Sequence, residues 1–198
     1  MRSFEAGDRP ILATSAVFEP NGDLLYFLKD ENIGGLFRRE AESGKELRLL
    51  LRQHLQLSDL SLSPDGAMLA ASSQQSAGVA NIAVLQSDGS NCRDVTGGDT
   101  VDSAPAWIPG VPNRLLFQSA GFARDAQGYV VALGPASIMK LDMGEERVLA
   151  TNVASYDVSP DGMIVYSNGR GVFVLDQHGS CELALADELV TEVVAAAA

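Results

Sequence analysis

The sequence has few of the residues that usually carry metal or covalent chemistry. Its 198 residues include only two cysteines and two histidines. A Ser-His-acid triad would have to use His54 or His178, and both fall in predicted connections between strands. No Gly-x-Ser-x-Gly, His-Glu-x-x-His, Walker or Cys-x-x-Cys motif is present. We therefore expect the chain alone to be no enzyme and to hold no metal and no cofactor.

Long apolar runs and excess positive charge are also missing. No stretch of about 18 apolar residues predicts a membrane span, and residues 1–10 lack the basic and apolar regions of a signal peptide. Lys and Arg number 14 against 26 Asp and Glu, which gives a net charge of −12. This charge argues against a nucleic acid partner. The expected location is cytoplasmic as the chain stands, or periplasmic if a signal peptide has been removed.

The sequence does contain a Pro-Asp-Gly turn that recurs. Ser63–Gly66 returns as Ser159–Gly162, Glu19–Gly22 is a looser copy, and Trp107–Gly110 is a degenerate one. The prolines stand at positions 20, 64, 109 and 160, in steps of 44, 45 and 51 residues. A period of this size indicates an array of supersecondary units.

Each turn lies between an alternating stretch and a short apolar run, which predicts a β-hairpin. A second turn, with a glycine at 44, 89, 144 or 179, separates two further strand-like runs. Each unit is therefore predicted to contain four strands, a to d, as in a β-propeller blade. The predicted fold class is all-β, a β-propeller of about four blades over residues 15–51, 58–96, 103–151 and 154–187. Residues 10–15 are predicted as an extra strand, and residues 191–198 as a tail.

These motifs resemble the TolB-like propeller repeat, also called the PD40 or WD40-like repeat. Ser63–Gly66 and Ser159–Gly162 match its Ser-Pro-Asp-Gly turn fully, Glu19–Gly22 matches it loosely, and residues 109–113 depart from it. The resemblance covers residues 15–187 and implies a propeller fold. Its proteins are often periplasmic, which conflicts with the missing signal peptide.

The number of blades in the native ring stays open. The strand at 10–15 could add to the fourth blade and close a four-bladed ring. It could instead be the remnant of a preceding blade, so that the chain is part of a longer propeller. Open strand edges in that case would invite self-association.

The two cysteines, Cys92 and Cys181, follow the second turn of units two and four. Equivalent positions in non-adjacent blades lie farther apart than the Cα separation of about 7 Å that a disulfide tolerates. We expect two free thiols, which favours a reducing compartment.

The irregular loops should gather on one face of the propeller. In an up-and-down blade, the b–c and d–a connections share one face, and the short a–b and c–d turns share the other. The b–c connection of unit three, Ser119–Ala136, is the longest. Long loops on a rigid scaffold are where binding residues concentrate. The predicted binding residues on this face are Phe122, Arg124, Asp125, Tyr129, His54, Asp99, Asp102, Asn168 and Arg170.

The sequence predicts a non-catalytic module that binds a protein or peptide through this loop face. Aromatic and Arg side chains, which are common interface anchors, support this reading. The alternative is a propeller accessory domain of a larger enzyme, such as a prolyl-oligopeptidase-like serine hydrolase. A catalytic centre in the propeller itself is disfavoured by the two histidines and the few basic residues on that face.

Overall fold

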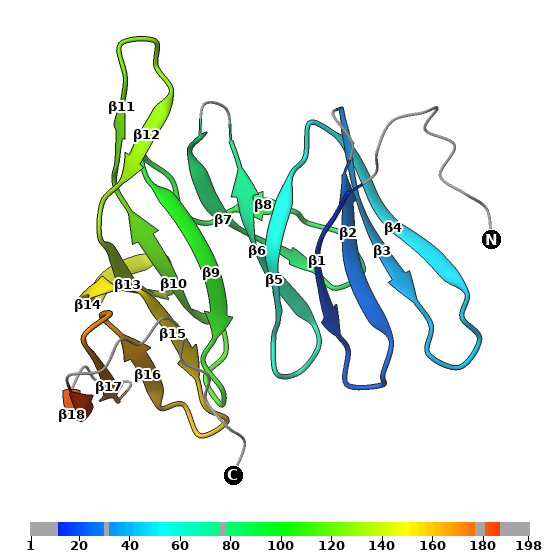
Figure 1. Cartoon of the computed structure of the whole chain (residues 1–198). Coiled ribbons are helices and arrows are strands. Elements are labelled where there is room, and N and C mark those ends of the chain that lie inside the picture. Colours follow the sequence, from blue (N-terminus) through cyan, green and yellow to red (C-terminus); the bar gives the residue numbers. More distant parts are fainter. Residues whose placement is uncertain (1–11, 30–31, 76–77, 177–180, 187–198) are drawn as a thin grey trace.

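The computed structural model describes residues 12–29, 32–75, 78–176 and 181–186, and these residues form an all-β structure (Figure 1). Their order along the chain follows the predicted alternation of strands and turns. The strands are β1 (Leu12–Phe18), β2 (Leu24–Lys29), β3 (Ile33–Arg39), β4 (Glu46–Gln53), β5 (Leu57–Leu62), β6 (Met68–Gln74), β7 (Ala80–Gln86), β8 (Arg93–Asp94), β9 (Val101–Trp107), β10 (Arg114–Ala120), β11 (Phe122–Arg124), β12 (Val130–Leu133), β13 (Ala136–Asp142), β14 (Glu145–Val153), β15 (Ser155–Val158), β16 (Ile164–Ser167), β17 (Gly171–Leu175) and β18 (Cys181–Ala186).

The strands pair into antiparallel sheets in chain order. The first sheet is β1–β4, and the fourth is β15–β18. Between them, β5–β8 form the second sheet, and β9, β10, β13 and β14 form the third. These two middle sheets are joined by one parallel bridge, between Ala80 and Val101. β11 and β12 form a separate hairpin.

The sheets follow one another as an open array. The first strand of each sheet contacts the first strand of the next, from β1 to β5, β9 and β15. Figure 1 shows the first and fourth sheets at opposite ends. Among the described strands, no pairing and no shared apolar cluster links these two sheets. Residues 12–18 form one continuous strand. We predicted a separate extra strand over residues 10–15. Residues 12–15 instead belong to β1 of the first sheet, so the prediction is wrong for the residues that the structure describes.

The core consists of three layers, each between two successive sheets. Leu25, Phe27 and Leu36 of the first sheet pack with the second sheet. The second layer contains Trp107, which is 9% exposed, and its Nε1 donates to the Ser61 carbonyl at 3.1 Å. Trp107 therefore packs between the second and third sheets. The third layer joins the third sheet to the fourth.

The Pro-Asp-Gly turns are stabilised by their own side chains. Asp65 Oδ1 accepts hydrogen bonds from the Ser63 hydroxyl at 2.6 Å and from the Ala67 amide at 3.0 Å. The Ser63 hydroxyl is the main cause that lowers the pKa of Asp65 below its usual value. Asp161 pairs with Ser159 in the same way. Asp65 therefore stabilises its turn through a hydroxyl and a backbone amide, and Asp161 does so through a hydroxyl.

Gly66 and Gly162 have φ of +72° and +85°. This is the left-handed region that a β-branched residue adopts only with strain. We expect Gly162→Val to lower the free energy of unfolding by more than about 1 kcal/mol. Gly162→Asn is the control, because Asn tolerates this conformation better. Thermal unfolding of both variants measures the difference, and equal melting temperatures would count against the assigned turn.

Hydrogen bonds also join the first strands of successive sheets. The Leu60 amide donates to Ser15 Oγ at 2.8 Å, and the Tyr156 hydroxyl donates to the Ala104 carbonyl at 2.5 Å. Burial raises the pKa of Tyr156, and the carboxylates of Asp157 and Asp59 add to the rise. The phenol therefore keeps its proton and remains a donor. The Cys92 thiol is free, whereas the Cys181 side chain lies outside the described part of the structure.

Candidate functional site

The connections divide between two ends of the sheets. In the first three sheets, the turns between first and second strands lie at the lower end of Figure 1. The connections from second to third strands and between sheets lie at the upper end, which we call the loop face. The hairpin of β11 and β12 projects from this face. The longest predicted loop, Ser119–Ala136, thus contains a β-hairpin.

Asp125 forms the tip of this hairpin. Its carboxylate Oδ1 accepts hydrogen bonds from the amides of Gln127 at 3.0 Å and Tyr129 at 2.9 Å. The Asp125 amide donates to the Tyr129 carbonyl at 2.9 Å, and the Gly128 amide donates to the Asp125 carbonyl at 3.0 Å. Asp125, which we predicted to bind a partner, has its carboxylate engaged in shaping the turn.

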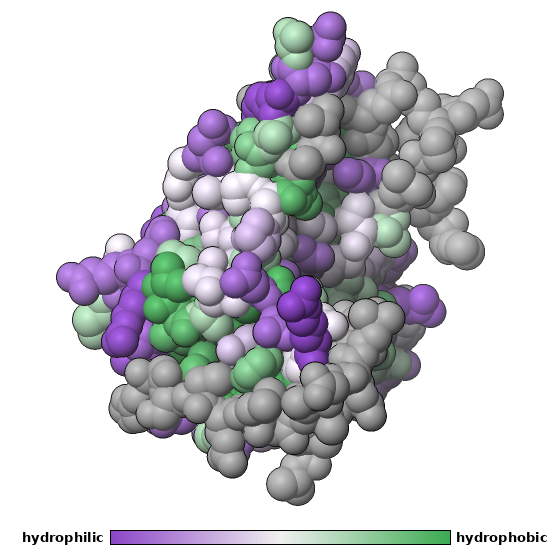
Figure 2. Space-filling view, turned by 60° about the vertical axis from the view of Figure 1, so that its left-hand side comes forward, coloured by the Kyte–Doolittle hydropathy of each residue, from purple (hydrophilic) through white to green (hydrophobic). Residues whose placement is uncertain are grey.

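The other predicted hairpin residues present aromatic and cationic groups. The Arg124 guanidinium lies 4.4 Å from the centre of the Phe122 ring, and its Nη1 donates to the Gly128 carbonyl at 2.9 Å. Tyr129 is 72% exposed and Leu133 is 60% exposed. Figure 2 shows the hairpin as a projection at the top, where mostly hydrophilic residues lie beside weakly hydrophobic ones. The ring, the guanidinium and the exposed apolar groups form a surface that can contact a partner.

The base of the hairpin is closed and braced. The Gly134 amide donates to the Gly121 carbonyl at 2.7 Å. A Cβ placed on Gly78, in the connection between β6 and β7, would lie 2.7 Å from Val130 Cγ2. The hairpin therefore leans on the second sheet, and only glycine at position 78 leaves room for this contact.

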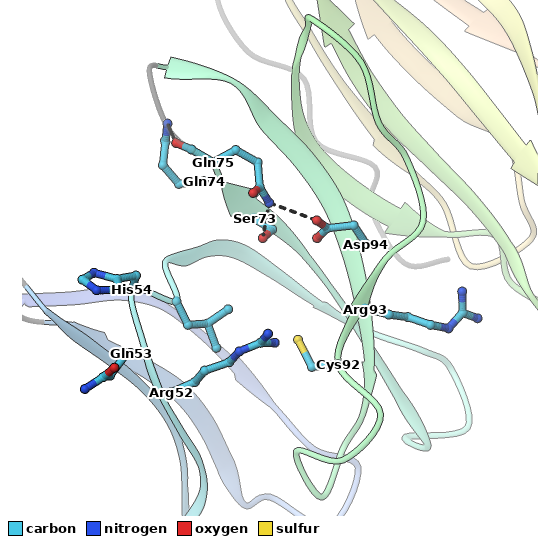
Figure 3. A pocket seen from close by; sticks show the side chains of 10 residues that line it. Arg52, Gln53, His54, Ser73, Gln74, Gln75, Cys92, Arg93 and Asp94 are labelled. Atoms are coloured by element: carbon cyan, nitrogen blue, oxygen red, sulfur yellow. Dashed lines mark hydrogen bonds between the residues drawn. The ribbon is translucent and has the colours of Figure 1, made fainter.

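A polar pocket of about 310 Å³ lies between the first and second sheets (Figure 3). Its lining includes Arg52, His54, Ser73, Gln75, Cys92 and Asp94. In Figure 3, Arg52 extends toward Cys92, whereas Arg93 points away. The ends of β4 and β6 form part of the pocket wall, which places it toward the loop face.

The pocket contains one carboxylate that accepts a side-chain hydrogen bond and one thiol that stays protonated. Gln75 Nε2 donates to Asp94 Oδ2 at 3.0 Å and to Ser73 Oγ at 3.2 Å. Burial raises the pKa of the Cys92 thiol, with Arg52 opposing this rise and Asp94 adding to it. A protonated thiol is a poor nucleophile. The pocket therefore offers hydrogen bonds and one guanidinium, without an activated nucleophile.

The structure does not bring all the predicted residues together. His54 lies in the pocket, whereas Phe122, Arg124, Asp125 and Tyr129 belong to the hairpin. Two further sets are separate. Asp99 is exposed in the connection before β9, and Asn168 and Arg170 are exposed in the connection between β16 and β17, where the Arg170 amide donates to Asn168 Oδ1 at 3.0 Å.

Asp102 is a correction. It is 2% exposed, and its carboxylate accepts hydrogen bonds from the hydroxyls of Thr96 at 2.6 Å and Ser119 at 2.7 Å. We predicted a surface residue because we placed Asp102 within the Gly- and Asp-rich connection between units two and three. In the structure it is the second residue of β9, opposite Ser119 of β10, and its side chain is turned inward.

Sequence reasoning missed Arg52, Gln75 and Asp94. They lie at strand ends, where a polar residue carries no signal beyond exposure. In the described residues there is no cluster of three or more His, Cys, Asp or Glu side chains that could hold a metal ion. No helix in the same part of the chain is long and apolar enough to cross a membrane.

Comparison with known proteins supports the fold. No protein-family model matches the sequence, and a search of curated proteins found no match. Solved structures do match. A putative TolB from Agrobacterium tumefaciens is 23% identical, with a TM-score of 0.58 over 88% of this chain and 62% of that chain. The chain has a propeller-like fold.

Two other solved structures are similar over most of this chain. A chain of the nidogen/laminin complex has a TM-score of 0.63 and 15% identity over 93% of this chain and 68% of that one. A prolyl endopeptidase has a TM-score of 0.61 and 18% identity over 90% of this chain but only 30% of its own length. The chain therefore spans about two thirds or less of these similar structures. At such identities the likeness establishes fold alone.

Proposed function

We propose that the chain is a non-catalytic propeller module that binds a protein or peptide through the β11–β12 hairpin and the adjoining loop face. The observation that carries this proposal is the hairpin itself. It projects from a rigid sheet, its turn is fixed by Asp125, and it holds Tyr129 and Leu133 largely exposed. Preordered aromatic groups lose little conformational entropy on binding, which makes them effective anchors.

The neighbouring pocket suits the polar part of such a ligand. Arg52 offers a planar charged donor, and the pocket also includes His54 and Gln53. A partner with an apolar side chain for the hairpin and a carboxylate or amide for the pocket fits this surface best. The chain's net charge of −12 makes a basic flank on the partner favourable for association.

The second candidate is an accessory propeller domain of a larger enzyme. The likeness to one part of a prolyl endopeptidase favours it, because this chain aligns over 90% of its length with 30% of that protein. The parent reading frame distinguishes the two functions. A continuation into a hydrolase domain with a Gly-x-Ser-x-Gly motif would support the accessory role.

The hairpin can be removed with little disturbance, because the Gly121–Gly134 hydrogen bond already holds its ends together. We expect a protein in which residues 122–133 are replaced by Asn-Gly to unfold within a few degrees of the wild type, since surface loops cost little to shorten. A displayed peptide library, selected on the wild-type protein, supplies the probe peptides. Calorimetry should then show their binding abolished by the deletion.

Point variants refine this test. Tyr129→Ala or Arg124→Ala should weaken peptide binding by about 30-fold or more, as expected for an anchor worth about 2 kcal/mol. Gln127→Ala is the matched control, because only the backbone of Gln127 takes part in the turn. Selected peptides that bind the trimmed protein as tightly as the wild type would refute the hairpin as the recognition element.

A further inference from the structure

The first and fourth sheets each have one face on which no other described sheet packs. In the other sheets, the equivalent face is buried against a neighbouring sheet. We call the side that a sheet turns toward the preceding sheet its backward face, and the opposite side its forward face. Each core layer joins a forward face to the backward face of the next sheet. Among the described residues, no sheet packs on the backward face of the first sheet or on the forward face of the fourth.

Turn hydrogen bonds identify equivalent positions on the backward faces. In each sheet, a backbone hydrogen bond closes the turn between the first and second strands, such as the Glu19 amide to the Asp23 carbonyl or the Ser159 amide to the Met163 carbonyl. The residue after the accepting carbonyl occupies the equivalent position in every sheet. The equivalent residues that follow are Leu24, Leu69, Leu115 and Ile164. The last three are 0%, 3% and 0% exposed, and each packs with the preceding sheet. Leu24 is partly exposed.

A pair of stacked aromatic rings occupies equivalent positions on the backward faces of the first and fourth sheets. Tyr166 and Phe173 stack with their ring centres 5.0 Å apart and belong to the layer against the third sheet. Tyr26 and Phe37, at the equivalent register of the first sheet, stack at 5.7 Å. On that same backward face, Phe18 is 71% exposed and Tyr26 is partly exposed, whereas Phe37 is 7% exposed. The first sheet is thus built like a sheet that has a predecessor.

The forward face of the fourth sheet is the counterpart. The register places Val172 opposite Ser167, where the earlier sheets have Leu36, Ile82 and Ile138. These three residues are 0% exposed, because each packs on the following sheet. Val172 and its neighbour on this face, Val174, are partly exposed, whereas Ser167 is 0% exposed.

We propose that a second copy of the chain covers these faces, with the forward face of the fourth sheet of one copy packed on the backward face of the first sheet of the next. The chain itself carries both halves of an interface that it already forms three times between its own sheets. Exposed apolar side chains such as Phe18 can mark an interaction surface. The contact is heterologous, because two different surfaces meet. It lies at the ends of the array and does not use the hairpin.

Sedimentation equilibrium of the wild-type protein tests this directly. The experiment is run at about 0.15 M ionic strength, where charges farther apart than about 8 Å are largely screened. We expect a mass of at least two chains at micromolar concentration. A monomer at tens of micromolar would overturn the proposal, whatever the variants do.

Two variants test which faces meet. Leu24→Asp blocks the backward face of the first sheet, and Val172→Asp blocks the forward face of the fourth. Each should be monomeric, or associate at least 30-fold more weakly. A mixture of the two should form a two-chain species, since each retains the face that the other has lost. Met143→Asp is the control, because Met143 is 93% exposed in the turn between β13 and β14 and should not matter.

Circular dichroism melting checks that each variant is folded, and Leu24→Ser and Val172→Ser are milder replacements if one is not. Dissociation by Leu24→Asp but not by Val172→Asp would mean that two first sheets meet face to face, and would overturn the head-to-tail contact. Dissociation by Met143→Asp, or failure of the mixture to associate, would overturn it as well.

Discussion

We expect Gly34→Ala to lower the free energy of unfolding by about 3 kcal/mol, at the upper end of the usual cost of overpacking. Gly34 lies in β3, where a Cβ would be 2.0 Å from the Leu55 carbonyl oxygen and 2.4 Å from Phe27 Cζ. Backbone cannot move aside as a flexible side chain can. The first sheet and the connection to β5 would therefore have to separate. For a chain of this size, the melting temperature should fall by roughly 6–12 °C.

Gly97→Ala is the matched control for this substitution. No atom lies within 4 Å of the position that a Cβ on Gly97 would occupy, and its backbone is not in the left-handed region. Its effect should stay within about 0.5 kcal/mol. If Gly34→Ala and Gly97→Ala melt together, the close approach of β3 to Leu55 is not maintained in solution.

The sequence predicts the repeating unit because turn chemistry is local. A Pro that presets φ, an Asp that accepts the hydroxyl of the Ser two residues before it and a Gly with positive φ form the same turn wherever they recur, as at residues 63–66 and 159–162. Gly34 gave no such signal. Its requirement comes from a carbonyl in the connection to another strand, and a contact across the fold is not encoded in the neighbouring residues.

The candidate site was only partly predictable for the same reason. The length of the Ser119–Ala136 segment indicated an insertion on the loop face, and Figure 1 shows one there. The contact of Val130 with Gly78 depends on tertiary packing. The pocket residue Arg52 acquires its meaning only when the first sheet meets the second.

Asp99 and Asp102 show this limit most clearly, since both are acidic residues in one polar segment. We expect Asp102→Ala to destabilise the protein by about 3 kcal/mol. It would leave the buried hydroxyl of Thr96 and the partly buried hydroxyl of Ser119 without their acceptor. Thr96 Oγ1 also accepts a hydrogen bond from the Ile82 amide at 2.8 Å. The carboxylate therefore stabilises a link from β7 of the second sheet to β9 and β10 of the third, and its loss should loosen the interface between these sheets.

Thermal and urea unfolding of three variants measure this effect. Asp102→Asn keeps the shape and one acceptor oxygen, so it should lose less stability than Asp102→Ala. Asp99→Ala, at an exposed position three residues away, should change the free energy of unfolding by no more than about 0.5 kcal/mol. Peptide binding to folded Asp102→Ala should persist, because its side chain does not reach the surface. Wild-type stability together with lost peptide binding would instead place Asp102 in the recognition surface and contradict its structural role.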